Sequence, residues 1–154
     1  MPSVEVRSAT PEDIPQLVDA YQWLFAPPGT TPQDWDPKTA TDRIARTIEG
    51  QGSNLLVAVD GDEVVGFCSM YLDLVSIRFG QRCWVEDLAV DPGRRSAGSG
   101  AALLKAAWQW AAANGASHLE LDSGMARVDA HRFYDRHQPA THSITFGWNK
   151  APQQ

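Results

Sequence analysis

Val85-Glu86-Asp87-Leu88-Ala89-Val90-Asp91-Pro92-Gly93-Arg94-Arg95-Ser96-Ala97-Gly98-Ser99-Gly100-Ala101-Ala102-Leu103-Leu104 is the stretch of sequence that decides the fold. Residues 84–90 are rich in strand formers, and the Pro-Gly pair after them ends any strand. Residues 101–113 are mostly good helix formers. The loop between them is small and basic, and a helix N-terminus offers free N–H groups and a positive dipole end. The stretch therefore predicts a phosphate or pyrophosphate site between a strand and a helix.

The glycines of this loop narrow the choice of anion. Gly98 and Gly100 let the backbone approach a ligand without a Cβ in the way. A nucleotide-triphosphate P-loop needs Gly-Lys followed by Ser or Thr, whereas Ala101 and Ala102 follow here. The dinucleotide fingerprint needs a third glycine and an acidic residue after a second strand, and only two glycines fit. Neither nucleotide motif is present.

Three blocks together resemble the GCN5-related N-acetyltransferase superfamily. The loop is similar to that family's acetyl-CoA loop, with matching residues Val90, Pro92, Arg95, Gly98, Gly100, Leu103 and Leu104. Residues 130–134, Ala-His-Arg-Phe-Tyr, resemble the family's Ala-x-x-Phe-Tyr helix near the C-terminus. Residues 6–13 resemble its first strand and helix start. The likeness covers nearly the whole chain and keeps the family's order.

The resemblance implies where coenzyme A would bind. The pantetheine arm would lie along the central strand and bond the main chain of Leu88, Ala89 and Val90. The pyrophosphate would rest on the loop amides, with charge added by an arginine. The implied loop residues are Arg94, Arg95, Ser96, Ala97, Gly98, Ser99, Gly100 and Ala101. His131 lies on the same helix face as Tyr134 and is a further coenzyme contact.

The reaction that the resemblance implies is attack of a neutral amine on the thioester. An alkyl amine has a pKa near ~10.4, so a base must take a proton from it, and an acid should protonate the leaving thiolate. Tyr134 is the candidate acid, because the family's tyrosine points at the coenzyme sulfur; it would also contact the coenzyme. Glu86 is the first candidate base, and Asp122 and Asp87 are alternatives. Alternation along a strand predicts that Glu86 and Asp87 face opposite sides. A strand amide near Leu88 would stabilise the oxyanion.

Two departures from the family pattern affect these expectations. Ser96 stands where relatives often have glycine, and coenzyme binding should survive that change. Gln138 and Pro139 replace the family's Gly-Phe after the C-terminal helix, so we expect the helix exit to differ. The family's asparagine upstream of the tyrosine is absent, with Arg127 near its place.

The element order predicts one domain over residues 1–150 and a frayed tail over 151–154. We expect strands at 4–8, 54–59, 63–74, 84–90, 117–122 and 142–148. Helices are expected at 14–25, 39–49, 98–113 and 128–137. Thr10 and Asp13 are expected to cap the first helix, and residues 60–62 to form a hairpin turn. The fold class is α/β (an α+β mixed sheet), with a central mixed sheet and helices on both faces.

Composition limits the partners. The chain has 154 residues, a net charge of -6 and a pI near 5, which argues against nucleic acid and favours a cationic amine substrate, small molecule or peptide. No apolar run is long enough for a membrane span, and no secretory signal is evident, so we expect a cytoplasmic protein. Cys68 and Cys83 are expected to be free thiols. The histidines have no ligand spacing, so no metal is expected; a homodimer is left open.

The sequence predicts an acetyl-CoA-dependent N-acetyltransferase that acts on a primary amine. A non-catalytic acyl-CoA-binding module is the alternative, and a nucleotide-phosphate-binding regulatory domain is a weaker one. Residues 23–35 and the loop 75–81 are the least family-like parts. Their aromatic and acidic side chains favour amine binding by cation–π contact and ion pairing, although Trp23 and Phe25 are equally typical of a helix-packing core.

Overall fold

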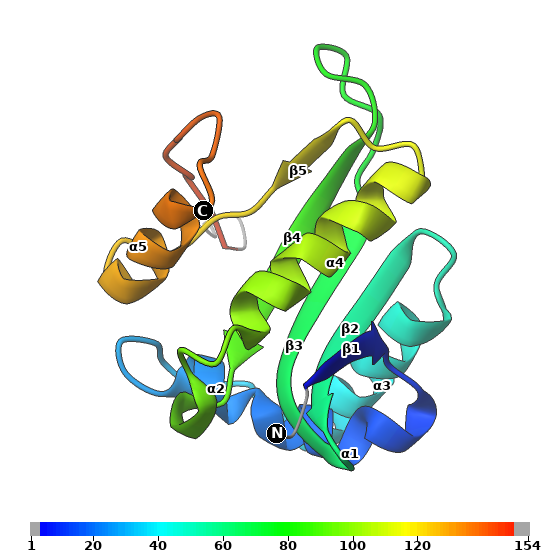
Figure 1. The fold of residues 1–154 in the computed structure, drawn as a ribbon, viewed down its shortest axis with the longest axis vertical. Helices are drawn as coiled ribbons and strands as arrows, with labels where there is room; N and C mark the ends of the chain where they lie inside the picture. Colours follow the sequence, from blue (N-terminus) through cyan, green and yellow to red (C-terminus); the bar gives the residue numbers. More distant parts are fainter. Residues whose placement is uncertain (1–3, 150–154) are drawn as a thin grey trace, which may run out of the picture. The chain divides into compact units, whose positions relative to one another are not determined.

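The computed structural model describes residues 4–149, in two compact units that comprise residues 4–121 and 122–149. The first unit contains a five-stranded sheet in the order β1 (Glu5–Ser8), β2 (Ser53–Asp60), β3 (Glu63–Leu72), β4 (Arg82–Val90) and β5 (His118–Glu120) (Figure 1). The first four strands pair antiparallel, and β4 and β5 pair parallel. The predicted mixed α/β fold is therefore confirmed.

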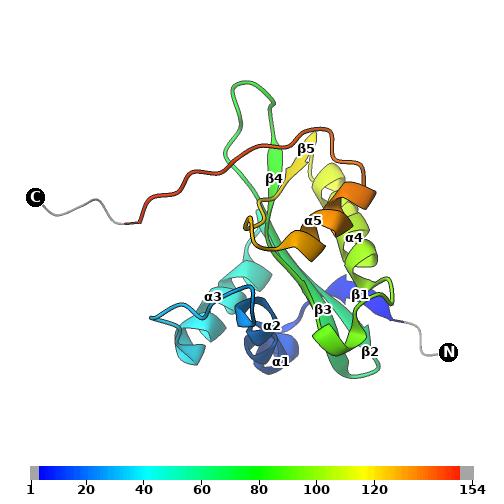
Figure 2. The same cartoon turned by 90° about the vertical axis from the view of Figure 1, so that its left-hand side faces the viewer.

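Helices cover both faces of this sheet (Figure 2). One face carries α1 (Ile14–Ala20), α2 (Gln22–Phe25) and α3 (Pro37–Glu49), and the other carries α4 (Ser99–Ala113). Leu17 and Ile44 pack with Phe67 on the first face, while Leu103 packs with Val85 on the second. Two hydrophobic layers thus sandwich the sheet, as the helix periodicity predicts.

The start of the first helix follows the predicted capping pattern. A 3₁₀ turn, η1 (Pro11–Asp13), precedes α1, and the Thr10 N–H donates to the Asp13 carboxylate at 2.8 Å. Arg7 of β1 donates two hydrogen bonds to the same carboxylate, at 2.7 and 3.0 Å. Hydrogen bonding from Arg7, more than any other cause, lowers the pKa of Asp13. This cluster fixes β1 to the helical layer.

Two helices differ from the predicted bounds. The single helix expected over residues 14–25 is broken at Tyr21, where a 3.0 Å bond from the Leu24 N–H to the Tyr21 carbonyl tightens the turn. Helix α3 begins two residues earlier than expected, because Asp36 caps it by accepting from the Thr39 N–H and Pro37 takes the first helical position.

Strands β2 and β3 form the predicted hairpin, with Asp60 opposite Glu63. The predicted strand over 117–122 is the shorter β5, which is half-buried rather than buried. Both cysteines are free, as expected, and the structure shows that both are fully buried. Within residues 4–149, no helix has the length and apolar character to cross a bilayer.

The second unit contains one helix, α5 (Val128–Arg136), close to its predicted range. The strand predicted over 142–148 is wrong: no strand occurs in residues 137–149 of the described chain. Its alternating apolar residues Ile144, Phe146 and Trp148 are 73–86% exposed, and a strand needs a sheet edge that supplies hydrogen bonds. The predicted tail, 151–154, lies outside the described residues.

Just after α5 the backbone has a left-handed conformation, which we did not expect for a glutamine at this position. Gln138 has φ 56°, in the region that glycine favours. Replacing glycine by glutamine therefore retains a left-handed backbone at this position, where a non-glycine residue carries about 1–2 kcal/mol of strain.

Candidate active site

The loop after β4 turns tightly into the N-terminus of α4. The Asp91 side chain accepts from the Gly93 N–H at 2.9 Å and starts the 3₁₀ turn η2 (Pro92–Arg94). Ser96 and Gly98 both have positive φ, 68° and 88°, and Gly98 is the N-cap of α4. The first turn of a helix leaves N–H groups without helical partners. The predicted anion site therefore has a left-handed turn directly before those amides.

Ser99 adds a polar group to this helix start. It is 3% exposed, and its hydroxyl has no hydrogen-bond partner among the described residues. Buried polar atoms in proteins are rarely left unpaired, so a ligand with acceptor oxygens fits this end of the helix. Gly98 lies in open space, since a Cβ built there would meet nothing within 4 Å.

The two loop arginines have different surroundings. Arg94 bonds Asp60 at 2.6 Å and Glu63 at 2.9 Å, so it ties the loop to the β2–β3 hairpin. Hydrogen bonding to Asp60, followed by the charge of Glu63, raises the pKa of Arg94. Arg95 is exposed and makes no ion pair with the described residues. Of the two predicted phosphate ligands, Arg95 is the one whose guanidinium is not already held by carboxylates.

A β-bulge in β4 determines where the candidate bases face. Ser69 of β3 pairs with Asp87 and Met70 pairs with Val85, so Glu86 is an extra residue in β4. Glu86 and Asp87 consequently line the same cavity. The prediction that they face opposite sides is wrong, because simple alternation does not continue through a bulge.

The bulge also corrects which neighbours share a face with these carboxylates. Val85 lies on the α4 face together with Leu88 and Val90, and Ala89 lies on the opposite face. Strict alternation predicts Val85 and Ala89 on the face of Asp87, and Leu88 and Val90 on the face of Glu86; of these expectations only that for Ala89 is confirmed.

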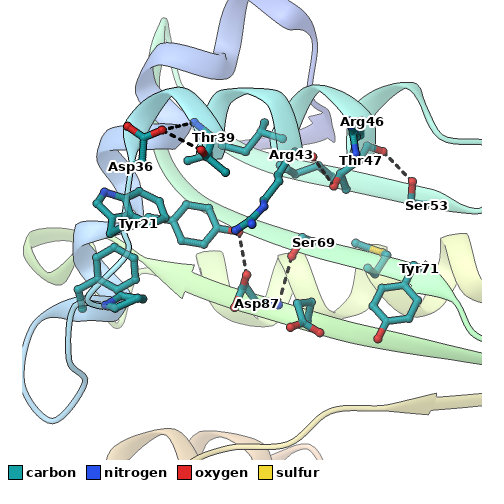
Figure 3. A pocket seen from close by; sticks show the side chains of 18 of the residues that line it. Tyr21, Asp36, Thr39, Arg43, Arg46, Thr47, Ser53, Ser69, Tyr71 and Asp87 are labelled. Atoms are coloured by element: carbon teal, nitrogen blue, oxygen red, sulfur yellow. Dashed lines mark hydrogen bonds between the residues drawn. The ribbon is translucent and has the colours of Figure 1, made fainter. Parts of the chain in front are cut away.

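The cavity has a volume of about 650 Å³ and lies between the sheet and the α1–α3 layer (Figure 3). Its walls come from β2, β3 and β4, from α3, and from the predicted acceptor segment, which contributes Phe25, Pro32, Asp34 and Trp35. Trp23 does not line it and instead packs on Phe67, with ring centroids 6.3 Å apart. The loop 75–81 does not contribute to this cavity.

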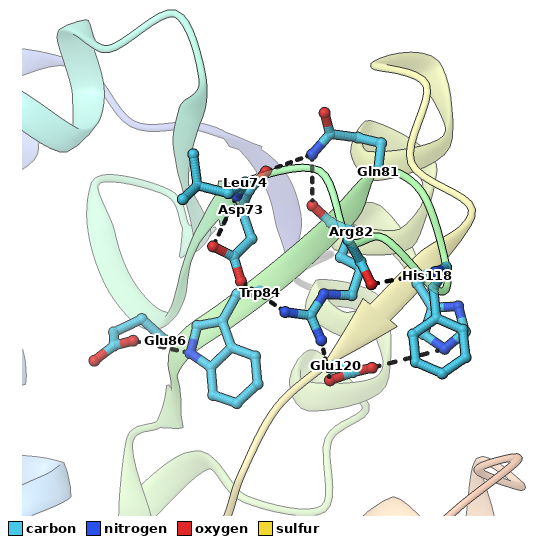
Figure 4. Close-up of polar contacts among 10 residues, drawn as sticks. Asp73, Leu74, Gln81, Arg82, Trp84, Glu86, His118 and Glu120 are labelled. Atoms are coloured by element: carbon cyan, nitrogen blue, oxygen red, sulfur yellow. Dashed lines mark hydrogen bonds and ion pairs between the residues drawn. The ribbon is translucent and has the colours of Figure 1, made fainter. Parts of the chain in front are cut away.

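Uncharged donors hold the carboxylates of the cavity. The Tyr21 hydroxyl donates to Asp87 at 2.7 Å (Figure 3), and the Trp84 indole N–H donates to Glu86 at 3.0 Å (Figure 4). Burial, and then the charge of Asp87, raises the pKa of Tyr21 well above its usual value, so Tyr21 stays a donor. The Asp87 N–H also donates to the Ser69 hydroxyl at 3.2 Å. At Glu86 the neutral indole leaves the negative charge of the carboxylate in place, which suits binding or deprotonation of an ammonium group.

Beyond Trp84 the sheet is open on one side of β4. Strand β5 pairs only with Arg82, Cys83 and Trp84. Ion pairs secure this short ladder, because Arg82 contacts Asp73 at 3.1 Å and Glu120 at 3.5 Å (Figure 4). From Glu86 to Val90, the edge of β4 that would continue toward β5 has no strand partner among the described residues.

The remaining candidate residues belong to the second unit. Asp122 is exposed, and His131 Nε2 lies 2.9 Å from the Gly124 carbonyl oxygen. Tyr134 packs against Phe133 within α5, with ring centroids 5.2 Å apart. Their roles toward β4 stay predictions. In residues 4–149, no three His, Cys, Asp or Glu side chains group as metal ligands would.

Comparison with known proteins identifies the family. The model of the acetyltransferase (GNAT) family matches residues 16–138, so the chain belongs to this family. It is 31% identical to an uncharacterized N-acetyltransferase, YhdJ, of Bacillus subtilis (strain 168), over 77% of this chain and 84% of that protein. It is 29% identical to an aminoalkylphosphonate N-acetyltransferase of Salmonella typhimurium, over 88% of this chain and 84% of that protein.

The fold is also found among solved structures. The aminoglycoside N-acetyltransferase AAC(6')-Iy in complex with CoA superimposes with a TM-score of 0.82 at 11% identity, over 97% of this chain and 96% of that one. The predicted family, fold and enzyme class, an N-acetyltransferase, are therefore confirmed.

Proposed function

We propose that this enzyme transfers the acetyl group of acetyl-CoA to a primary amine by direct attack of the amine on the thioester. The observation that carries the proposal is the open edge of β4, which runs from the bulge to the anion-binding loop. An extended pantetheine arm can pair with the main chain of Leu88, Ala89 and Val90 as an added strand, and the pyrophosphate then reaches the N-terminus of α4. Membership of the acetyltransferase family supports the same assignment.

The loop residues have separate tasks in this proposal. The amides of residues 95–101 hold the pyrophosphate, Arg95 adds positive charge, and Arg94 keeps the loop against the hairpin. Ser99 offers its buried hydroxyl to a phosphate oxygen. His131 is a further candidate contact from α5.

The carboxylates at the bulge supply the base. Glu86 takes a proton from the incoming ammonium, directly or through water, so that the nitrogen lone pair can attack the thioester carbon. The N–H groups of the strand near Leu88 stabilise the oxyanion, and collapse of the intermediate breaks the C–S bond while the nitrogen releases its second proton to solvent. Tyr134 gives a proton to the leaving thiolate. Asp87 and Asp122 remain alternatives to Glu86 as the base.

Relatives' names describe two kinds of amine acceptor. One relative is an aminoalkylphosphonate N-acetyltransferase, and solved structures of the same fold include aminoglycoside acetyltransferases. Both fit a primary amine as the acceptor here, and the α1–α3 cavity is the proposed place for it.

Ligand-dependent melting tests coenzyme binding. Acetyl-CoA at a hundred times its dissociation constant should stabilise the protein by about 2.7 kcal/mol, while ATP and NAD should not. Stabilisation by ATP or NAD alone would favour the nucleotide-binding alternative and reject ours. Thiol release over a panel of amines then tests transfer, and binding without any turnover would favour the non-catalytic module.

Two glycines with similar backbones make a matched pair of variants. Gly98 and Gly61 both have positive φ, 88° and 59°, and both face open space. Gly98→Ala and Gly61→Ala should therefore lose similar stability, but only Gly98→Ala should weaken acetyl-CoA binding. Equal coenzyme affinity in the two variants would reject the loop as the anion site.

Substitution at the two reacting positions separates their roles. Tyr134→Phe should lower kcat strongly and leave coenzyme affinity nearly intact, whereas Glu86→Gln should lower kcat/KM most at low pH, where the amine is fully protonated. Unchanged turnover in Tyr134→Phe would remove the acid role, and an unchanged pH profile in Glu86→Gln would move the base to Asp87 or Asp122.

A further inference from the structure

One face of α3 forms a wall of the proposed acceptor cavity. Its contributing residues recur at helical spacing: Asp36, Thr39, Ala40, Arg43, Ile44, Arg46 and Thr47. Ala40 and Ile44 are buried at the base of this wall. Two arginines, Arg43 and Arg46, therefore belong to the lining, and Figure 3 shows the Arg43 side chain extending from α3 into the cavity.

Neither arginine has a carboxylate partner in the described chain. Elsewhere in the first unit, Arg7, Arg82 and Arg94 each contact at least one carboxylate within 3.5 Å. No such contact involves Arg43 or Arg46, although acidic residues line the same cavity.

Neutral donors contact three of the acidic groups in the cavity. Asp36 accepts from Thr39 at the helix N-terminus, Glu86 from Trp84, and Asp87 from Tyr21. The cavity thus keeps positive charge without a carboxylate partner on the α3 wall, and negative charge at Glu86 of the β4 bulge.

We propose that the acceptor is an amine that also carries an anionic group, a carboxylate or a phosphonate. Its ammonium end lies at Glu86, where the reaction takes place, and its anionic end is bound by Arg43, with Arg46 adding positive charge. The proposal rests on the proposed function, since it names the substrate class of that same site.

Guanidinium chemistry favours this class of acceptor over others. A planar guanidinium donates two parallel hydrogen bonds to a carboxylate or phosphonate, which gives both affinity and orientation. A polycation without an anion would meet two like charges on α3, and a plain alkylamine would leave both arginines unused. Only a molecule with both charges matches both walls of the cavity.

Matched probes test the assignment. Short ω-amino carboxylates and ω-aminoalkylphosphonates are compared with n-alkylamines of the same chain length, as acceptors in thiol release. We expect kcat/KM to favour at least one anion-bearing series by about tenfold to a hundredfold, the range of a hydrogen-bonded charged pair. The difference in kcat/KM between the carboxylate series and the phosphonate series then shows which anion is preferred.

Variants of α3 identify the group responsible. Arg43→Gln should abolish the preference by lowering kcat/KM for anion-bearing amines alone, and Arg43→Lys should restore part of it. Lys38→Gln is the matched control, because it removes one positive charge from the same helix at a residue outside the cavity lining; it should keep the preference. Equal reactivity of neutral and anion-bearing amines, or an equal loss for both in Arg43→Gln, would overturn the inference.

A binding measurement keeps this test independent of turnover. Calorimetric titration of the same probes into the protein saturated with coenzyme A should give tighter binding of the anion-bearing amine, and Arg43→Gln should remove the difference. Absence of any anion preference in binding would overturn the inference even if acetyl-CoA is used on neutral amines. Conversely, an Arg43-dependent anion preference without thiol release would contradict the proposed transfer reaction and leave the binding class standing.

Discussion

The two buried thiols should make this protein unusually sensitive to alkaline pH. Cys68 and Cys83 are free, and both are fully buried against α4. Burial is the main cause that raises the pKa of Cys68, and the neighbouring Cys83 adds to it; burial also raises the pKa of Cys83 to about 11. Unfolding exposes both thiols, whose pKa then returns to about 8.5. Folding therefore prevents two groups from ionising.

The size of the effect follows from proton linkage. A group whose folded pKa is raised keeps its stabilising contribution below the unfolded pKa and loses it as pH rises toward the folded pKa. Each thiol lowers the free energy of unfolding by about 1.36 kcal/mol per pH unit above ~8.5. Two thiols cost about 4 kcal/mol between pH 7 and pH 10, which is a large share of a typical stability of about 5–15 kcal/mol.

Urea unfolding, followed by tryptophan fluorescence in the presence of a reductant, measures this slope between pH 7 and pH 10. The double variant Cys68→Ala, Cys83→Ala should be less stable at pH 7, by roughly 1–2 kcal/mol per site for the lost packing, and should show a much flatter pH dependence. Val85→Ala is the matched control, because it removes buried volume from the same face without removing a titrating group. A wild-type curve that is flat above pH 8.5, or a double variant that keeps the wild-type slope, would refute the reasoning.

Three further predictions concern the site and its support. Tyr21→Phe keeps the ring packing and removes the hydrogen bond to Asp87, so thermal or urea unfolding should report a loss of about 1.5–3 kcal/mol; no loss would mean that the hydroxyl is not a donor there. Because the pKa of Asp13 is lowered in the fold, Asp13→Asn should lose about 2 kcal/mol near neutral pH and progressively less below pH 4, whereas the exposed Asp19→Asn should change little; an equal loss at every pH would exclude the charge as the cause. Ser96→Gly relieves a positive φ and should raise stability in a melt by at most about 1 kcal/mol, since glycine costs entropy in the unfolded chain, and a lower midpoint would contradict the strain.

Local sequence signals predicted most of the fold. The capping residues Thr10 and Asp13, the turn at Gly61 and the helix formers after Gly98 act within a few residues of themselves, so one sequence is enough to find them. The prediction of a strand over residues 142–148 was wrong because it depended on a partner elsewhere in the chain. The alternation of these residues is clear, but a strand also needs a partner, which local sequence does not supply.

The candidate site was predictable only in part. Glu86 was identified from its strand, but its orientation depends on a register shift opposite Ser69 and Met70, and the sequence carries no mark of that shift. Arg43 was missed, although it repeats at helical spacing from Asp36 and Thr39. On sequence alone, such a polar face is indistinguishable from one that meets only water, and the cavity in front of it is a property of the folded chain.

The extra residue in β4 shifts the alternation of side chains between the two faces of the sheet by one position. Before Glu86, odd-numbered residues such as Cys83 and Val85 enter the α4 core; after it, even-numbered residues such as Leu88 do so. Deleting Glu86 would leave Val85 followed directly by Asp87, so that one uninterrupted alternation would still place Val85 and Leu88 in the α4 core. The residue proposed to do the chemistry is thus one that the core packing of the strand does not require, and its insertion places a second carboxylate beside Asp87 on the cavity face.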